Sequence, residues 1–441
     1  MTLTRQLSRV AKLLVDAEGI SFPGAEQRLR AMTLDIVVGP DAASPAGHAA
    51  VLTAFAVSRR TFLGGVRVTG DLGQPLQSSL STRPTLGEAL AEFGVMGLVG
   101  SAAVTIGIGT AGNLNGILAW WDGWRAGVRG WDGFTLGVSN NPLAGVAAGA
   151  HAVGAAFQTL RGHTALPADI DLWPGAETAP EFAEIFLPSL LWLFGLGNLG
   201  QAFLWSLAAL PYAGHADRAV MLQDYDRVSE ENWGTSILVP DDCFGALKTK
   251  MAEAWAEARG FRVSRIDRAL RADLRIADGE PRLALSGLDK VAPRRLLAAT
   301  GFDAIIDVGL GRSAVDFDRY RVNVFDAYRR IDTHFDGVAD PIPKPAAPNT
   351  PAYAGLEAEI GRCGAAEVGN ASVAVPYVSA IAAAVAVARA IAICSGQACS
   401  PGDVQKLSAT ERRAVAEPYL PQTSGIGHSG RPRTLVGATG L

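Results

Sequence analysis

A glycine-rich loop between an apolar strand and a helix constrains the fold more than any other feature of the sequence. Gly195, Gly197 and Gly200 follow the apolar residues 190–194, which predict a buried strand, and they open a helix expected over 200–210. Glycine lets the backbone approach a phosphate, and the helix N-terminus offers free N–H groups to an anion. This order of elements is typical of the ligand-binding edge of a parallel α/β sheet.

An acidic strand end follows the glycine loop. The apolar residues 219–223 predict the next strand, and Asp224 and Asp226 come directly after it. In a dinucleotide-binding sheet, an acidic residue at this point holds the ribose hydroxyls. A second match to the glycine spacing, at residues 107–112, has no such acidic strand behind it. We interpret those glycines as packing and turn residues.

Strand and helix patterns alternate along most of the chain, which predicts parallel sheets with helices on their faces. In the first part, strands are expected at 34–39, 65–70, 103–109 and 134–138, and helices at 46–62, 86–93 and 142–160. In the second part, further strands are expected at 304–308 and 319–326, and further helices at 248–259 and 377–393. The expected fold class is therefore α/β.

Composition divides the chain into two α/β domains. Prolines and acidic residues cluster in 166–184, which is typical of a linker. We therefore expect one domain over 1–165, a second over 185–415 and a C-terminal tail over 416–441.

The hydrophobic content raises the question of a membrane. Hydrophobic residues make up 49% of the 441 residues and charged residues 19%, which excludes a disordered chain. The apolar stretches 93–121, 185–214 and 368–388 are long enough to span a bilayer. They contain glycine, asparagine or proline, and they lack flanking basic clusters and aromatic belts. We interpret them as buried strands and helices and expect no membrane partner.

Charge and cysteine content exclude other classes. The net charge of −4, without a basic stripe, argues against a nucleic-acid partner. The four cysteines are too few for a disulfide scaffold, and without paired CxxC motifs we expect no structural zinc. The first residues contain no apolar core of a signal peptide, so we expect a cytoplasmic protein.

Polar residues at fixed spacing follow the second strand. Asp224, Asp226 and Val228 lead to Asn232, and Lys248 comes sixteen residues after that asparagine. In this pattern the sequence resembles the ThiF/MoeB family, which includes the ubiquitin-activating enzymes, over about residues 185–395. The resemblance implies a Rossmann-like, mostly parallel sheet that forms an adenylation domain. It also implies that residues 1–165 are a degenerate pseudo-adenylation domain.

The resemblance implies ATP and Mg²⁺ as cofactors. A triphosphate needs backbone donors, a cationic side chain and a hard carboxylate for the metal. By resemblance, the glycine loop and Asp226 line the nucleotide, and Asp224 takes the ribose. Asn232 and Lys248 contact the phosphates, and Asp307, at the end of a later strand, holds the magnesium.

The chain departs from the family at two places that affect how the phosphate charge is neutralised. Thr235 stands where the family has an arginine, and the strand of Asp307 continues without the family's Asp-Asn pair. The cation must then come from elsewhere. Arg312 is one candidate. Arg5 is another, because the N-terminal segment resembles the family's arginine-bearing helix; its alternative role is a solvated helix face.

Cys363 resembles the family's acyl-accepting cysteine. It follows a proline-rich segment and precedes a long apolar helix, so 336–363 is expected to form a crossover loop. A thiolate is a strong nucleophile, and the neighbouring arginine favours its ionised form. The alternative is a structural thiol, which is also our interpretation of Cys243, Cys394 and Cys399.

The implied function is ATP-dependent activation of a ubiquitin-like protein. Its C-terminus would be adenylated and then passed to Cys363 as a thioester for a conjugating enzyme, in a pathway of bacterial antiviral defence. Four alternatives stay open: activation of a sulfur carrier, activation of a small molecule, an NAD-dependent oxidoreductase, and an inactive binding scaffold. The sequence also leaves open whether the protein is a homodimer.

Overall fold

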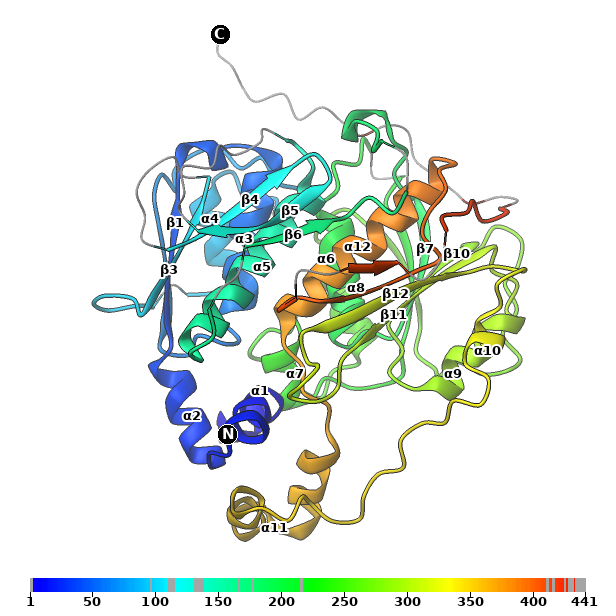
Figure 1. Ribbon diagram of the computed structural model, residues 1–441. Helices are drawn as coiled ribbons and strands as arrows, with labels where there is room; N and C mark the ends of the chain where they lie inside the picture. Colours follow the sequence, from blue (N-terminus) through cyan, green and yellow to red (C-terminus); the bar gives the residue numbers. More distant parts are fainter. Residues whose placement is uncertain are drawn as a thin grey trace.

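Two separate sheets, one from each half of the chain, organise the protein (Figure 1). The structure is a computed structural model, and it describes residues 3–95, 97–109, 116–130, 139–164, 167–175, 178–214, 217–409, 412–414 and 417–423, with residues 426 and 432. Each sheet joins a parallel block to an antiparallel block, so the α/β class expected from the sequence is confirmed.

The first sheet has the strand order β2-β1-β3-β4-β5-β6. Its strands are β1 Thr33–Val38, β2 Gly65–Thr69, β3 Val104–Ile108, β4 Ile117–Asp122, β5 Arg125–Gly130 and β6 Ala168–Asp171. The first four run parallel, and β5 and β6 are antiparallel. β6 lies in the segment expected to be a linker, and the strand predicted at 134–138 falls outside the described residues.

The second sheet has the order β14-β13-β12-β11-β10-β7-β8-β9. Its strands are β7 Leu190–Phe194, β8 Ala219–Gln223, β9 Arg262–Ile266, β10 Leu283–Ser286, β11 Ala304–Leu310, β12 Arg319–Phe325, β13 Gly402–Lys406 and β14 Arg412–Ala414. β7 to β11 pair in parallel, and β12 to β14 are antiparallel. β7 and β8 have the predicted bounds, whereas the short β10 and the polar, half-exposed β9 were not predicted.

The predicted helices are present, and so is the N-terminal helix that the resemblance implied. The structure adds helices that were not predicted, at Phe22–Ala31, Glu230–Thr235, Val291–Leu296, Ile331–His334 and Pro351–Asn370. The helices of the described residues are α1 Leu3–Glu18, α2 Phe22–Ala31, α3 Pro45–Ser58, α4 Leu86–Phe93, α5 Pro142–Leu160, α6 Asn198–Ala209, α7 Glu230–Thr235, α8 Lys248–Glu257, α9 Val291–Leu296, α10 Ile331–His334, α11 Pro351–Asn370 and α12 Pro376–Cys394. Thr85 caps α4 by accepting the Glu88 N–H.

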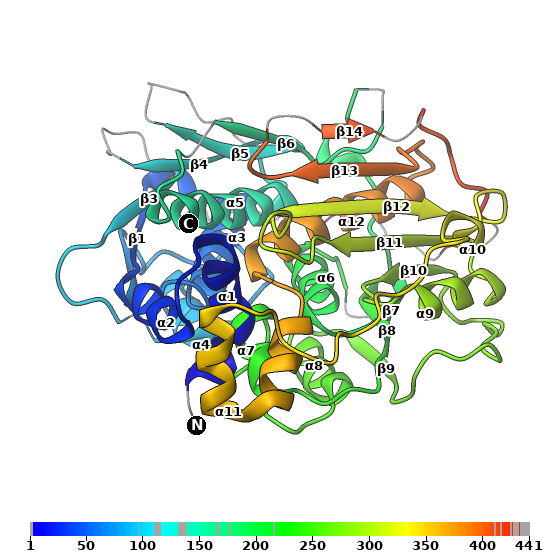
Figure 2. The ribbon, with the colours of Figure 1, turned by 60° about the horizontal axis from the view of Figure 1, so that its bottom comes forward.

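Two long apolar helices form the shared core of the halves. α5 and α12 are long and apolar enough to cross a membrane, but 78% and 94% of their apolar windows are buried inside the protein. α5 packs on α3 and α12, and α12 packs on α6 (Figure 2). The α3–α5 contact is close because it is made of small residues: a Cβ at Gly145 or Gly149 would overlap the carbonyl of Ala46 or Ala50.

The close α3–α5 contact predicts an unusual response to alanine. Gly149→Ala should lower the free energy of unfolding by about 2 kcal/mol, since overpacking against backbone outweighs the better helix propensity of alanine. Gly355→Ala is the matched control, because Gly355 is a helical glycine with no atom near its missing Cβ. Urea unfolding should show a stabilised or unchanged control. Equal effects of both substitutions would contradict the packing.

Candidate functional site

The register of the second sheet brings three loops to one edge. Phe194 pairs with Gln223 on one side and with Ser286 on the other. The loops after β7, β8 and β10 therefore open at the same edge, where a cavity of about 640 Å³ lies. The strand order reverses between β7 and β10, and ligands bind at such a reversal in open α/β sheets.

The glycine loop forms the floor of this cavity. Gly195 has φ +78°, which favours glycine, and a Cβ added at Gly197 would meet open space. A Cβ at Gly200 would overlap the carbonyl of Gly195, so Gly200 lets the helix approach the loop and is not on the cavity wall. No described side chain caps the N-terminus of α6. Its first N–H groups are available to an anion.

The predicted polar residues meet on the cavity wall. The Asp224 carboxylate accepts the N–H groups of Leu196 at 2.5 Å and Asp226 at 2.8 Å, which ties the glycine loop to the end of β8. Lys248 Nζ donates to the Asp226 carboxylate at 3.0 Å. The Asn232 side-chain oxygen accepts the Ser229 N–H at 2.9 Å and holds the first turn of α7.

Cations outnumber acids on the wall. The cations are Arg9, Arg227, Lys248, Arg268, Lys290, Arg294 and Arg312, and the acids are Asp224, Asp226, Glu231 and Asp289. This surplus of positive charge, beside an uncapped helix N-terminus, suits a polyanion such as a nucleoside triphosphate.

An arginine from the N-terminal half reaches this wall. Arg9 on α1 donates two hydrogen bonds to Glu231 on α7, at 3.0 and 2.9 Å. The side chain of Arg5, the predicted arginine, lies outside the described residues. Arg9 is four residues further along the same helix, and residues four apart share one helix face. That spacing is the signal that could have identified Arg9.

Thr235 stands where the family has an arginine, so this position supplies no cation. It is buried, and its hydroxyl donates to the Glu231 carbonyl at 3.3 Å. Arg312 does line the cavity, as expected, and its Nε donates to the Ser372 hydroxyl at 3.0 Å. Arg294, which sequence reasoning missed, lines the same wall.

Asp307 does not lie on the cavity wall. It is fully buried, accepts the Ser286 hydroxyl at 2.8 Å and pairs with Arg294 at 3.3 Å. Burial raises the pKa of its carboxyl, and Arg294 and Ser286 oppose this shift. The predicted strand end at 308 was wrong, because pairing with β12 extends β11 to Leu310. Asp307 is therefore inside a strand rather than at its end.

A different carboxylate, that of Asp289, lies on the cavity wall. Asp289, in the loop after β10, lines the cavity and is exposed. Sequence reasoning missed it because β10 has only four residues, too few for a clear strand pattern.

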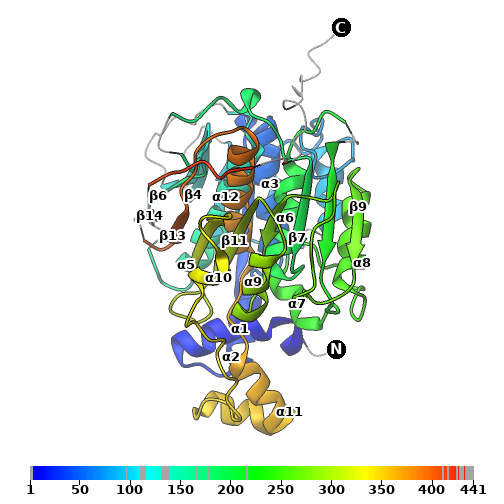
Figure 3. The same cartoon turned by 90° about the vertical axis from the view of Figure 1, so that its right-hand side faces the viewer.

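Cys363 lies outside the cavity wall, on an exposed part of α11. The expected crossover loop over 336–363 is helical from Pro351 onward, with a break at Gly361, where φ is +78°. α11 lies at the end of the molecule formed by α1 and α2 (Figures 1 and 3). Tyr353 anchors it there: its hydroxyl donates to Asp16 at 2.9 Å and accepts from Lys12 at 2.7 Å.

The other cysteines have different surroundings. Burial raises the pKa of Cys394 to about 12 and of Cys399 to about 11, so both stay thiols near neutral pH. Cys243 is half-buried, and burial raises its pKa as well.

Comparison with known proteins identifies the family. The BilD N-terminal domain family matches residues 33–170, and the BilD C-terminal domain family matches residues 187–397. The chain is 34% identical over 410 residues to the bacterial E1-like protein BilD of Collimonas sp. (strain OK412), over 86% of this chain and 87% of that protein. The chain belongs to the BilD family of bacterial E1-like proteins. The resemblance to ubiquitin-activating enzymes is thereby confirmed.

Solved structures show a more distant likeness. The crystal structure of E. coli MccB covers 54% of this chain and 65% of MccB, at 14% identity and a TM-score of 0.36. The crystal structure of selenomethionine PaaA covers 53% of this chain and 65% of PaaA, at the same identity and TM-score. The family membership of this E1-like chain rests on the sequence matches.

The cavity predicts that Lys248 binds nucleotide. Lys248→Ala should raise the Kd for ATP by about 10- to 100-fold, since a charge-assisted hydrogen bond contributes 1.5–3 kcal/mol. Lys250→Ala, on the same helix but off the wall, should leave the Kd unchanged in isothermal titration calorimetry. Equal losses in both variants would mean that general charge, and not this position, attracts ATP.

Proposed function

We propose that the chain activates a ubiquitin-like protein by ATP-dependent adenylation of its C-terminus. The observation that carries this proposal is the cavity at the strand ends of the second sheet, where the glycine loop, the uncapped α6 N-terminus and the cationic wall converge in an E1-like protein. The triphosphate would lie over the glycine loop, with its ribose hydroxyls on Asp224 and its phosphates near Lys248 and Asn232.

The reaction needs positioning and charge neutralisation more than covalent chemistry. A carboxylate oxygen at the C-terminus of the ubiquitin-like protein attacks the α-phosphorus of ATP. The bond from that phosphorus to the bridging oxygen breaks, and pyrophosphate leaves with the electron pair. Arg9, Arg294 and Arg312 line the cavity and would supply the positive charge that Thr235 does not.

The donor set fits a magnesium ion held jointly with the phosphates. Mg²⁺ usually takes one or two carboxylates together with phosphate oxygens and water, and it would neutralise phosphate charge. Asp289 is exposed on the wall, whereas Asp307, the residue expected from the sequence, is paired with Arg294. We therefore assign the metal contact to Asp289 and a positioning role, through Arg294, to Asp307.

This assignment predicts different effects for two conservative substitutions. Asp289→Asn should raise the Mg²⁺ concentration for half-maximal activity by about tenfold, which corresponds to 1.4 kcal/mol. Asp307→Asn should lower stability by about 3 kcal/mol, since it breaks a buried ion pair, with little change in the Mg²⁺ requirement. Magnesium titrations of pyrophosphate exchange, with urea unfolding of each variant, measure both effects. The reverse pattern would restore Asp307 as the ligand.

The first sheet would be the degenerate half. At the end of β3, a Cβ on Gly109 would overlap backbone of Ala42, and the Asp41 N–H donates to the Gly109 carbonyl at 3.0 Å. This close packing supports the interpretation of Gly109 as a packing residue. We also propose that the protein acts in the cytoplasm, in a bacterial conjugation pathway for antiviral defence, and passes the activated ubiquitin-like protein to a conjugating enzyme.

Cys363 is the proposed thioester carrier. The helical residues 362–370 span roughly 13 Å at 1.5 Å per residue, and they lead to Ser372 on the cavity wall. Transfer of the acyl group to the thiol therefore needs α11 to approach the cavity, with attack of sulfur on the acyl carbon and departure of AMP.

Replacement of the Cys363 thiol should separate adenylation from thioester formation. Cys363→Ala should keep pyrophosphate exchange and lose the thiol-sensitive adduct on a non-reducing gel, because adenylation precedes sulfur attack. Cys243→Ala, in a half-buried cysteine off the nucleotide wall, should keep both. An adduct that survives Cys363→Ala would assign the acyl group to another nucleophile.

The function itself is tested by exchange of labelled pyrophosphate into ATP with a candidate ubiquitin-like protein. Exchange should require the partner's free C-terminal carboxylate and stop when that terminus is amidated. Exchange supported by a small carboxylic acid alone would favour small-molecule activation instead.

A further inference from the structure

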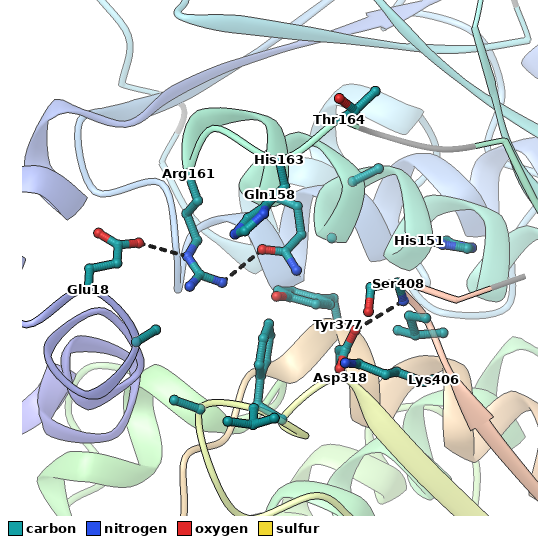
Figure 4. Close-up of a pocket in the computed structure, with 17 residues that line it drawn as sticks. Glu18, His151, Gln158, Arg161, His163, Thr164, Asp318, Tyr377, Lys406 and Ser408 are labelled. Carbon is teal, nitrogen blue, oxygen red and sulfur yellow. Dashed lines mark hydrogen bonds and ion pairs between the residues drawn. The ribbon is translucent and has the colours of Figure 1, made fainter.

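A second cavity, of about 670 Å³, lies between residues of the two halves of the chain (Figure 4). On one side α1, α5 and residues 161–164 form its wall. On the other, the wall comes from the β11–β12 loop, the first turn of α12 and the end of β13. Its volume is typical of small-molecule sites. The β11–β12 loop contributes to the walls of both cavities, since Arg312 lines the candidate nucleotide site and Ala314 lines the second cavity.

Three buried side chains on this wall each have one polar atom without a hydrogen-bond partner among the described residues. His151, Asp318 and Tyr377 are 4%, 3% and 1% exposed. Among the described residues, no hydrogen bond reaches His151 Nδ1, Asp318 Oδ1 or the Tyr377 hydroxyl. A buried polar atom that stays unpaired destabilises the folded protein. Three of them in one cavity leave open hydrogen-bonding positions that a bound molecule can fill.

These groups are held in place by their surroundings. The second carboxylate oxygen of Asp318 accepts the Ser408 N–H at 3.0 Å, and its carbonyl accepts the Leu407 N–H at 3.0 Å. The Tyr377 ring lies in a notch of α5, because a Cβ added at Gly154 would come within 2.9 Å of that ring. The side chains of Asp318 and Tyr377 are therefore preorganised, which reduces the entropy lost on binding.

The wall of this second cavity carries both positively and negatively charged side chains. Arg161 donates to Glu18 at 3.1 Å and to Gln158 at 2.8 Å, and Lys406 also lines the cavity (Figure 4). The Asp318 carboxylate can only accept hydrogen bonds and needs a nitrogen or hydroxyl donor, whereas Arg161 and Lys406 favour an anion.

His151 and Tyr377 are uncharged, so each can pair with a donor or with an acceptor on a ligand. Burial lowers the pKa of His151 to about 4, so its imidazole is uncharged near pH 7. Burial raises the pKa of Tyr377, so its phenol keeps its proton. Each can donate or accept a hydrogen bond.

We propose that this cavity binds a ligand with amino-acid chemistry. Its nitrogen donates to Asp318, and its carboxylate accepts from Tyr377 and faces Arg161 and Lys406. Ala155, Phe317 and Leu407 provide an apolar wall for a side chain. A free amino acid and the C-terminal residue of a peptide share this chemistry. The proposal does not depend on the adenylation function, because binding is measured without ATP or a protein partner.

Calorimetric titration with the natural L-amino acids tests the proposal. The amide of the strongest binder should bind at least about tenfold more weakly, since it lacks the charged carboxylate. If the site takes peptide ends, the N-acetyl derivative should bind as well as the free amino acid; if it takes free amino acids, acetylation should abolish binding. An amide that binds equally would overturn the proposal.

Substitutions locate the binding in this cavity. Tyr377→Phe removes only an unpartnered hydroxyl, so it should leave stability intact and weaken binding about fivefold. Asp318→Asn should weaken it by about tenfold or more. Tyr328→Phe and Asp278→Asn are the matched controls, on exposed residues away from the cavity. If no amino acid binds at millimolar concentration, or if the cavity variants bind like the controls, the cavity holds water only and the proposal fails.

Discussion

The parallel pairing of β7 with both β8 and β10 is the constraint on which the site depends. This pairing places the residues after Phe194, Gln223 and Ser286 at one edge, and it fixes the start of α6 beside the acidic end of β8. Gly200 then lets α6 pack directly on the glycine loop. A side chain there would push the helix away, and the free N–H groups would no longer face the cavity.

The N-terminal half positions this site and does more than cover it. Arg9 on α1 pairs with Glu231, and Arg60 after α3 donates to the carbonyls of Trp233 and Val239 at 2.9 and 2.8 Å. Both contacts hold α7, the helix that carries Asn232. Arg60 is fully buried, and burial lowers its pKa to about 9, yet it remains charged near neutral pH. The first half of the chain therefore helps to fix the helix that carries one of the wall residues.

Strong local patterns made part of this arrangement predictable. The bounds of β7 and β8 follow from apolar runs that end in glycine or aspartate. The wall positions of Asp224, Asp226, Asn232 and Lys248 follow from the resemblance to the ThiF/MoeB family that these residues carry. Asp289 escaped prediction because β10 is short. Asp307 was misplaced because antiparallel pairing with β12, the next strand in the sequence, extends β11 beyond it. Tertiary contacts of Tyr353 likewise order α11, which the proline-rich sequence before it does not indicate.

The stoichiometry of nucleotide binding tests most directly whether one sheet carries the site while the other supports it. Calorimetric titration of the whole chain with ATP and magnesium should give one bound nucleotide per chain. A stoichiometry of two would place a nucleotide on the first sheet as well, and the absence of binding would show that the edge of β7, β8 and β10 is not a nucleotide site.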